Sequence, residues 1–140
     1  MKVSESMSQN PTMITPNQTL LEAAKQMATL HVGSLPVSDK DRIVGIVTDR
    51  DIAVRGIAAG KGPKSKVSEV MTERVKYCFD DQSIEEVAQE MSKLGVRRLP
   101  VVNRDKRLVG ILSLGDIAKK DGDGRTAGSA LRELATLNAA

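Results

Sequence analysis

Hydrophobic positions along the chain predict a short succession of strands and helices that is then repeated. A helix is predicted at 20–31, where apolar residues recur every three or four positions. Apolar runs at 35–37 and 43–47 are typical of strands, and a second helix is predicted at 51–59. With a short strand at 12–15 ahead of the first helix, the predicted order is strand, helix, strand, strand, helix.

The second half of the chain restates this order. It predicts a strand at 75–79, a helix from Ile84 to Leu94, and strands at 99–101 and 108–112. Thr19 and Ser83 are 64 positions apart, whereas Gly45 and Gly110 are 65 apart. The second hairpin turn therefore holds one extra residue, and exposed turns are where a structural repeat tolerates an insertion.

The repeat divides the chain into domains. We predict a first domain at 7–60, a linker at 61–70, a second domain at 71–122 and a tail at 123–140. Within the tail, glycines at 122–128 predict a break before a short amphipathic helix at 129–137. A unit of about 55 residues buries too little surface to be stable alone, so the two units are expected to pack about a pseudo-two-fold axis.

Each repeat carries a hydroxyl and a carboxylate three residues apart, directly after an apolar strand. Gly45-Ile46-Val47-Thr48 leads to Asp51, and Gly110-Ile111-Leu112-Ser113 leads to Asp116. Taken singly, each motif is explained by helix capping, because such a pair satisfies the free N–H groups of a helix N-terminus. Their recurrence in register favours a pair of matching binding sites, and both interpretations can hold together.

The charge and amino-acid composition argue against nucleic-acid, metal and membrane partners. The formal charge is +3, acidic residues alternate with basic ones, and the chain has one Tyr, one Phe and no Trp. We therefore expect no nucleic-acid partner, because stacking platforms and a strong basic face are missing. A single cysteine, Cys78, and a single histidine, His31, give no expected disulfide or metal site. No apolar run of membrane-span length is present, so a cytoplasmic protein without a membrane partner is expected.

The sequence also argues against an enzyme. It offers no Ser-His-Asp set, no Cys-His pair and no glycine-rich phosphate loop. We therefore expect a non-catalytic protein.

Taken together, these features resemble a tandem pair of CBS (cystathionine beta-synthase) domains, or Bateman module, over residues 7–120. The resemblance is carried by the two Gly-apolar-apolar-Thr/Ser-x-x-Asp motifs, the two Leu-Pro-Val strands and the two capped helices. It is particularly similar to short stand-alone bacterial CBS-pair proteins. The resemblance implies an α+β fold (the α/β-type CBS fold) of two β-α-β-β-α repeats. It also implies a regulatory, energy-sensing module that binds AMP, ADP or ATP between the repeats, with S-adenosylmethionine or NAD(H) as alternatives and no required cofactor.

The same resemblance implies the binding residues, with each aspartate accepting the ribose 2′ and 3′ hydroxyls. One site would combine Thr48 and Asp51 with Gln82, Val87, Val96, Arg97 and Arg98. The other would combine Ser113 and Asp116 with Gln18, Ala23, Val32, Gly33 and Ser34. Because the arginines stand where the first repeat has Gly33 and Ser34, we expect the Asp51 site to hold phosphate more tightly.

Two protein partners are expected, a second copy of the chain and an effector. Apolar surface left on the helices predicts a homodimer, and the signal would pass to an unidentified protein effector. The alternative is a structural interaction module whose clefts stay empty.

Overall fold

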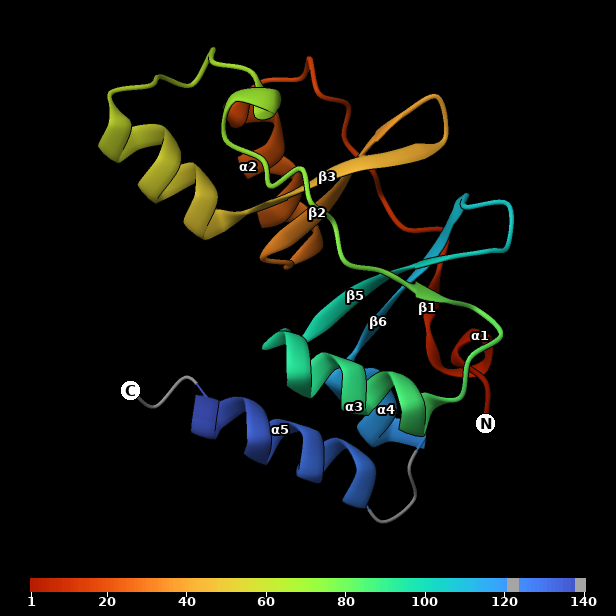
Figure 1. Cartoon of the computed structure of the whole chain (residues 1–140). Helices are drawn as coiled ribbons and strands as arrows, with labels where there is room; N and C mark the ends of the chain where they lie inside the picture. Colours follow the sequence, from red (N-terminus) through yellow and green to blue (C-terminus); the bar gives the residue numbers. More distant parts are fainter. Residues whose placement is uncertain (121–123, 138–140) are drawn as a thin grey trace. The chain divides into compact units, whose positions relative to one another are not determined.

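The computed structural model describes residues 1–120 and 124–137, which form two compact units (Figure 1). The first-repeat unit contains residues 12–75. The second-repeat unit contains residues 1–11 together with the chain from residue 76 onward. Both units mix helices with antiparallel hairpins, so the predicted α+β class with a repeated plan is confirmed.

The first-repeat unit is built on one hairpin and one long helix. Its elements are α2 (Leu20–Leu30), β2 (Ser34–Asp39), β3 (Arg42–Thr48), the π-helical turn η1 (Asp51–Gly56), and the short 3-10 turns η2 (Ile57–Ala59) and η3 (Val67–Glu69). Strands β2 and β3 pair antiparallel. The strand predicted at 12–15 is reduced to a single bridge between Ile14 and Val37. The predicted helix at 51–59 is a π-helical turn followed by a 3-10 turn.

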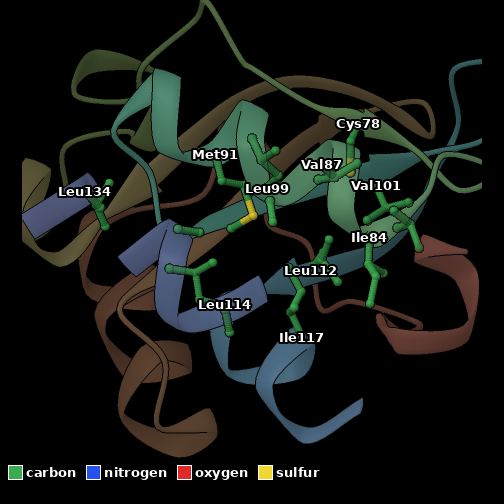
Figure 2. Close-up of a cluster of buried hydrophobic side chains, with 14 residues drawn as sticks. Cys78, Ile84, Val87, Met91, Leu99, Val101, Leu112, Leu114, Ile117 and Leu134 are labelled. Atoms are coloured by element: carbon green, nitrogen blue, oxygen red, sulfur yellow. The ribbon is translucent and has the colours of Figure 1, made fainter. Parts of the chain in front are cut away.

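The second-repeat unit contains a four-stranded sheet in the order β1-β6-β5-β4. Its elements are α1 (Val3–Ser6), β1 (Ser8–Gln9), β4 (Cys78–Phe79), α3 (Ile84–Leu94), β5 (Arg98–Val102), β6 (Leu108–Ser113), α4 (Leu114–Lys120) and α5 (Arg125–Leu137). Figure 2 shows side chains from the sheet, α3 and α4 converging on one apolar core, among them Met91, Leu99, Leu112 and Ile117. Burial of these side chains is the main driving force for this fold.

The C-terminal helix differs from its prediction. Helix α5 begins at Arg125, whereas the sequence predicted a break across 122–128; residues 121–123 lie outside the described part. Ala127 and Ala130 are buried against the core of the unit, and the Ser92 hydroxyl donates a hydrogen bond to the Ala130 carbonyl at 3.2 Å. This packing outweighs the low helix propensity of Gly128.

The two long helices end in the same left-handed conformation with different residues. The residue that closes α2 is His31, at φ 55°, and the residue that closes α3 is Gly95, at φ 71°. A side chain other than glycine is strained in this region because its Cβ crowds the following carbonyl. The first repeat therefore carries a strain that the second repeat avoids.

Replacing His31 by glycine is expected to raise the free energy of unfolding by about 0.5–1 kcal/mol, because the strain is relieved at some cost in chain entropy. Urea denaturation monitored by circular dichroism measures this change. The reverse substitution, Gly95→His, is expected to lower the stability by a similar amount. A lower midpoint for His31→Gly would contradict the prediction.

Two short segments, at 1–9 and 65–73, complete the cores of the units. Val3, which precedes the predicted first domain, is 0% exposed in the core of the second-repeat unit. Val67, in the predicted linker, is 0% exposed in the core of the first-repeat unit. The Val3 N–H donates to the Gln82 carbonyl and the Val67 N–H donates to the Gln18 carbonyl, each at 2.8 Å. Each unit is thus closed by the segment that precedes the other repeat in the sequence.

Candidate functional site

The two hydroxyl–carboxylate motifs adopt the same geometry. The Asp51 N–H donates to Thr48 Oγ1 and the Thr48 N–H donates to Asp51 Oδ2, both at 3.0 Å. Ser113 and Asp116 repeat these two bonds at 3.0 Å. The capping interpretation is therefore confirmed for both motifs. Asp51 Oδ2 is used by the cap, while Asp51 Oδ1 lies 3.9 Å from the guanidinium of Arg55, a side chain that is 51% exposed.

The hairpin brings the start of one strand beside the motif at the end of the next. Ser34 lies opposite Thr48, and Pro36 lies opposite Ile46. Their neighbour Leu35 is buried in the core, and side chains alternate between faces along a strand, so these four residues share the other face. The same pairing in the second-repeat unit sets Arg98 opposite Ser113 and Pro100 opposite Ile111.

This pairing associates each motif with the strand start of its own repeat. The Asp49 N–H donates to the Gly33 carbonyl at 2.9 Å, and the Leu114 N–H donates to the Arg97 carbonyl at 3.0 Å. Arg97 and Arg98 are thus neighbours of Ser113. The arginines that led us to expect a tighter Asp51 site belong, within their unit, to the Asp116 motif. The predicted combinations of each aspartate with residues of the other repeat stay predictions.

Asp49 is a neighbour of the motif that the sequence did not single out. A Cβ placed on Gly33 would lie 3.1 Å from Asp49 Oδ2, so the carboxylate rests against the backbone at the start of β2. The equivalent residue of the second repeat is Leu114, whose side chain is buried in the core. The residues between hydroxyl and aspartate, which change freely between the repeats, therefore give the two motifs different surroundings.

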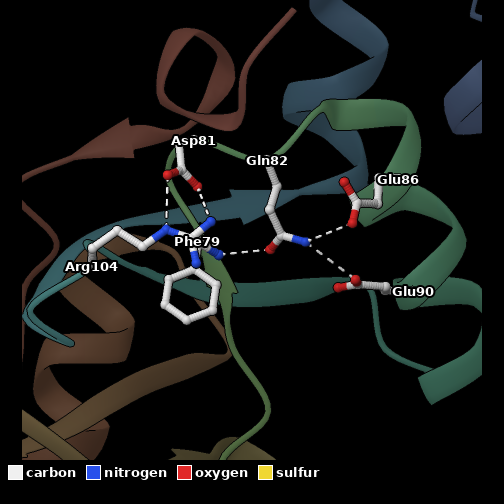
Figure 3. A network of polar contacts seen from close by, with 6 residues as sticks. All are labelled: Phe79, Asp81, Gln82, Glu86, Glu90 and Arg104. Atoms are coloured by element: carbon white, nitrogen blue, oxygen red, sulfur yellow. Dashed lines mark hydrogen bonds and ion pairs between the residues drawn. The ribbon is translucent and has the colours of Figure 1, made fainter.

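The two predicted site glutamines both fasten the turn before a helix. Gln82 Oε1 accepts the Phe79 N–H at 2.8 Å, and its amide donates to Glu86 at 3.1 Å and Glu90 at 3.3 Å (Figure 3). Gln18 makes the equivalent bond with the Thr15 N–H at 2.9 Å. These bonds give both glutamines a structural role within their own units.

The four predicted apolar site residues differ in how far their side chains are buried. Ala23 and Val87 are 0% exposed in the cores of their units, where each packs among buried side chains. Val32 and Val96 are only partly buried, and their N–H groups each donate to the carbonyl five residues earlier at 3.1 Å. Val32 and Val96 therefore follow the ends of α2 and α3 and pack against the cores of their units.

A second polar cluster lies at the β5–β6 turn. Arg104 donates to both carboxylate oxygens of Asp81, at 2.8 and 2.7 Å, and its guanidinium carbon lies 4.1 Å from the centre of the Phe79 ring (Figure 3). The hydrogen bond from Arg104 lowers the pKa of the Asp81 carboxyl. Both side chains are solvent-exposed, so this pair contributes little to stability.

Cys78 is inert in the folded protein, because burial raises the pKa of its thiol to about 12. Folded protein at pH 8 is therefore expected to react with a thiol reagent at least about 100-fold more slowly than urea-unfolded protein. Absorbance after addition of an aromatic disulfide measures both rates. Equal rates would show that the strand carrying Cys78 is open in solution.

Across 1–120 and 124–137, no three His, Cys, Asp or Glu side chains gather closely enough to hold a metal ion. Within the same part of the chain, every helix is too short or too polar to cross a membrane.

Comparison with known proteins places this geometry in a family. The CBS domain matches the chain twice, at residues 3–55 and 67–123. The CBS domain-containing protein YhcV of Bacillus subtilis (strain 168) is 38% identical over 136 residues, which cover 97% of this chain and 96% of YhcV.

Two solved structures show the same fold with ligands. The CBS domain pair of MJ0100, in complex with 5′-methylthioadenosine and S-adenosyl-L-methionine, has a TM-score of 0.77 and 32% identity, over 87% of this chain and 96% of that one. CBSX2 in complex with AMP has a TM-score of 0.75 and 26% identity, over 86% of this chain and 95% of that one. With two matched domains, the repeated fold and these relatives, the chain belongs to the CBS-domain family as a tandem CBS pair.

Proposed function

We propose that this protein is a non-catalytic regulatory module that binds adenosine-containing ligands, with Asp51 and Asp116 as the ribose-binding groups. The observation that carries the proposal is the repeated pair of 3.0 Å hydrogen bonds between Thr48 and Asp51 and between Ser113 and Asp116. Each pair fixes its aspartate beside the face of a hairpin that is turned away from the core. A carboxylate has only acceptors, so it suits two adjacent hydroxyl donors. The capping bonds hold it in one orientation before the ligand arrives, which reduces the entropic cost of binding.

The ligands of the relatives support this choice. AMP, 5′-methylthioadenosine and S-adenosylmethionine, which are bound by CBSX2 and MJ0100, share an adenosine with a vicinal ribose diol. Ile46 in one unit and Ile111 in the other are partly exposed and provide aliphatic surface beside each motif, opposite the buried Pro36 and Pro100. Such surface can take the face of a base in place of aromatic stacking.

Titration calorimetry and thermal shifts with AMP, ADP, ATP, NADH, S-adenosylmethionine and 5′-methylthioadenosine test the proposal. Ligands that bind only the folded state raise its melting temperature. The double variant Asp51→Asn and Asp116→Asn keeps an acceptor for each cap but removes both charges, and it is expected to lose the shifts. Wild-type protein without a shift for any ligand would favour the interaction module with empty clefts. Chromatography of incubated ligands checks for turnover, which would overturn the non-catalytic assignment.

The first-repeat unit also supports the proposal of a homodimer. Leu21, Val54 and Ile57 are 48%, 49% and 60% exposed on α2 and the following turns. In the second-repeat unit, by contrast, α5 packs on α3 and α4. Analytical ultracentrifugation is expected to show a dimer that Leu21→Glu together with Ile57→Glu shifts toward monomer. A wild-type monomer at high concentration would end this part of the proposal.

A further inference from the structure

Opposite charges surround the two otherwise matching motifs. In the first-repeat unit, the exposed carboxylate of Asp49 lies beside Gly33, at the start of the strand that pairs with Thr48. In the second-repeat unit, the exposed side chains of Arg97 and Arg98 begin the strand that pairs with Ser113. The difference lies at equivalent places, because Gly33 corresponds to Arg97 and Asp49 corresponds to Leu114 in the repeat.

The arginines are available for a ligand. Among the described residues, the guanidinium groups of Arg97 and Arg98 make no hydrogen bond or ion pair, unlike Arg104, which is held by Asp81. The bond from the Leu114 N–H to the Arg97 carbonyl fixes the backbone of this segment without using either side chain. A free guanidinium presents paired donors that match phosphate oxygens.

Asp49 is fixed beside Gly33, the residue that corresponds to Arg97 of the other unit. Its Oδ1 accepts the Arg50 N–H at 2.8 Å, and its backbone N–H is bonded to Gly33. Arg55, 3.9 Å from Asp51, offsets part of the negative charge. The first-repeat motif therefore presents two carboxylates with partial compensation, whereas the second presents one carboxylate among free cations.

We propose, on the basis of the proposed function, that the two sites take different adenosine ligands. The Asp116 site binds adenosine compounds that carry a 5′ phosphate. The Asp51 site binds adenosine compounds whose 5′ group is neutral or cationic, such as a thioether or a sulfonium. Asp49 is the residue that excludes phosphate from the Asp51 site, and Arg97 and Arg98 are the residues that attract phosphate to the Asp116 site.

The expected size of the effect follows from the exposure of these groups. A charge at the surface near a ligand phosphate is partly screened by water and salt, so each one changes affinity by about tenfold, or about 1.4 kcal/mol. Three charge differences acting in the same sense are enough to separate the preferences of two sites. Because these terms are electrostatic, AMP binding is expected to weaken with added salt while binding of 5′-methylthioadenosine changes little.

Calorimetry on the full chain with AMP and with 5′-methylthioadenosine tests this assignment. Asp116→Asn is expected to weaken AMP binding at least tenfold and leave 5′-methylthioadenosine binding intact, and Asp51→Asn is expected to do the reverse. Thermal denaturation without ligand verifies that each variant is folded. If neither ligand binds wild-type protein, the proposed function itself fails. If both ligands bind and each aspartate variant weakens both equally, only the division between the sites is overturned.

Charge variants test the named determinants directly. Arg97→Ala and Arg98→Ala are each expected to weaken AMP about tenfold without changing 5′-methylthioadenosine binding. Asp49→Asn in the Asp116→Asn background is expected to strengthen AMP binding at the remaining site by about tenfold. Lys106→Asn is the matched control, because it removes an exposed cation that lies in the β5–β6 turn. Asparagine tolerates the φ of 62° that Lys106 adopts there. An equal effect of Lys106→Asn and Arg97→Ala on AMP would reduce the arginine effect to overall charge and overturn the assignment.

Discussion

Replacing Val3 by aspartate is expected to unfold the second-repeat unit, although Val3 is the third residue of the chain. Its side chain is 0% exposed in a core with Cys78, Leu99 and Ile117. A carboxylate placed there without a partner costs about 4 kcal/mol or more, which is a large share of the 5–15 kcal/mol that stabilises a typical domain. Urea denaturation and the rate of Cys78 labelling measure the loss.

Two matched variants show whether the effect comes from the core. Ser8→Asp introduces the same charge into the same segment at an exposed position, and it is expected to change stability by less than about 0.5 kcal/mol. Val67→Asp makes the equivalent change in the first-repeat core and is expected to destabilise as strongly as Val3→Asp, with slower labelling of Cys78. Labelling of Cys78 that is no faster in Val3→Asp than in Ser8→Asp would show that burial of Val3 does not close the second-repeat unit.

The parts of the fold that depend on local signals were predicted from the sequence. The helix predicted at 20–31 is observed at Leu20–Leu30, where the Thr19 hydroxyl accepts the Glu22 N–H at 3.2 Å. Ser83 and Glu86 repeat this cap before α3. A cap followed by apolar residues at helical spacing determines a helix almost independently of its surroundings.

The exchange of the two short segments is non-local, and periodicity could not predict it. Segments 1–9 and 65–73 each have too few residues for a hydrophobic period, and each packs on chain that is distant in the sequence. A signal was nevertheless present. Val3-Ser4-Glu5-Ser6-Met7 and Val67-Ser68-Glu69-Val70-Met71 are nearly identical, which extends the repeat to residues before the predicted first domain and into the predicted linker.

The repeated motif of the candidate site could be recognised from the sequence, whereas the local packing of the residues around it could not. The repeated hydroxyl and carboxylate identified both motifs, because capping and ligand binding require the same residue types. Alignment of the repeats could not show that Ala23 and Val87 are core residues or that Gln18 and Gln82 fasten turns, because these depend on how each helix packs. Asp49 could not be identified from the repeat, because the equivalent residue of the second repeat is Leu114.

Replacing Gly110 by alanine is expected to destabilise the protein by about 1–3 kcal/mol, which is typical of overpacking. The Met7 sulfur lies directly over this glycine, and an added Cβ would stand 2.8 Å from the Ser8 carbonyl oxygen. The methionine side chain can move away, but the carbonyl belongs to the backbone of β1, which pairs with β6. The motif glycine is therefore required by the segment that closes the unit, independently of any ligand.

Alanine variants of Gly45, in the other repeat, and of Gly62, in the linker, separate the effect of the backbone contact from that of the methionine contact. At Gly45 an added Cβ would lie 2.7 Å from the Met71 sulfur but 3.0 Å from the Thr72 carbonyl oxygen, so Gly45→Ala is expected to cost less than Gly110→Ala. Gly62→Ala, with nothing within 4 Å, is expected to stay within about 0.5 kcal/mol of wild type. Urea denaturation ranks the three variants. If Met7→Ala restores the stability of Gly110→Ala completely, the side chain and not the β1 backbone sets the requirement for glycine. If the loss persists, the pairing of β1 with β6 sets the requirement for glycine, and the end of β6 that carries Ser113 and leads to Asp116 on α4 depends on that pairing.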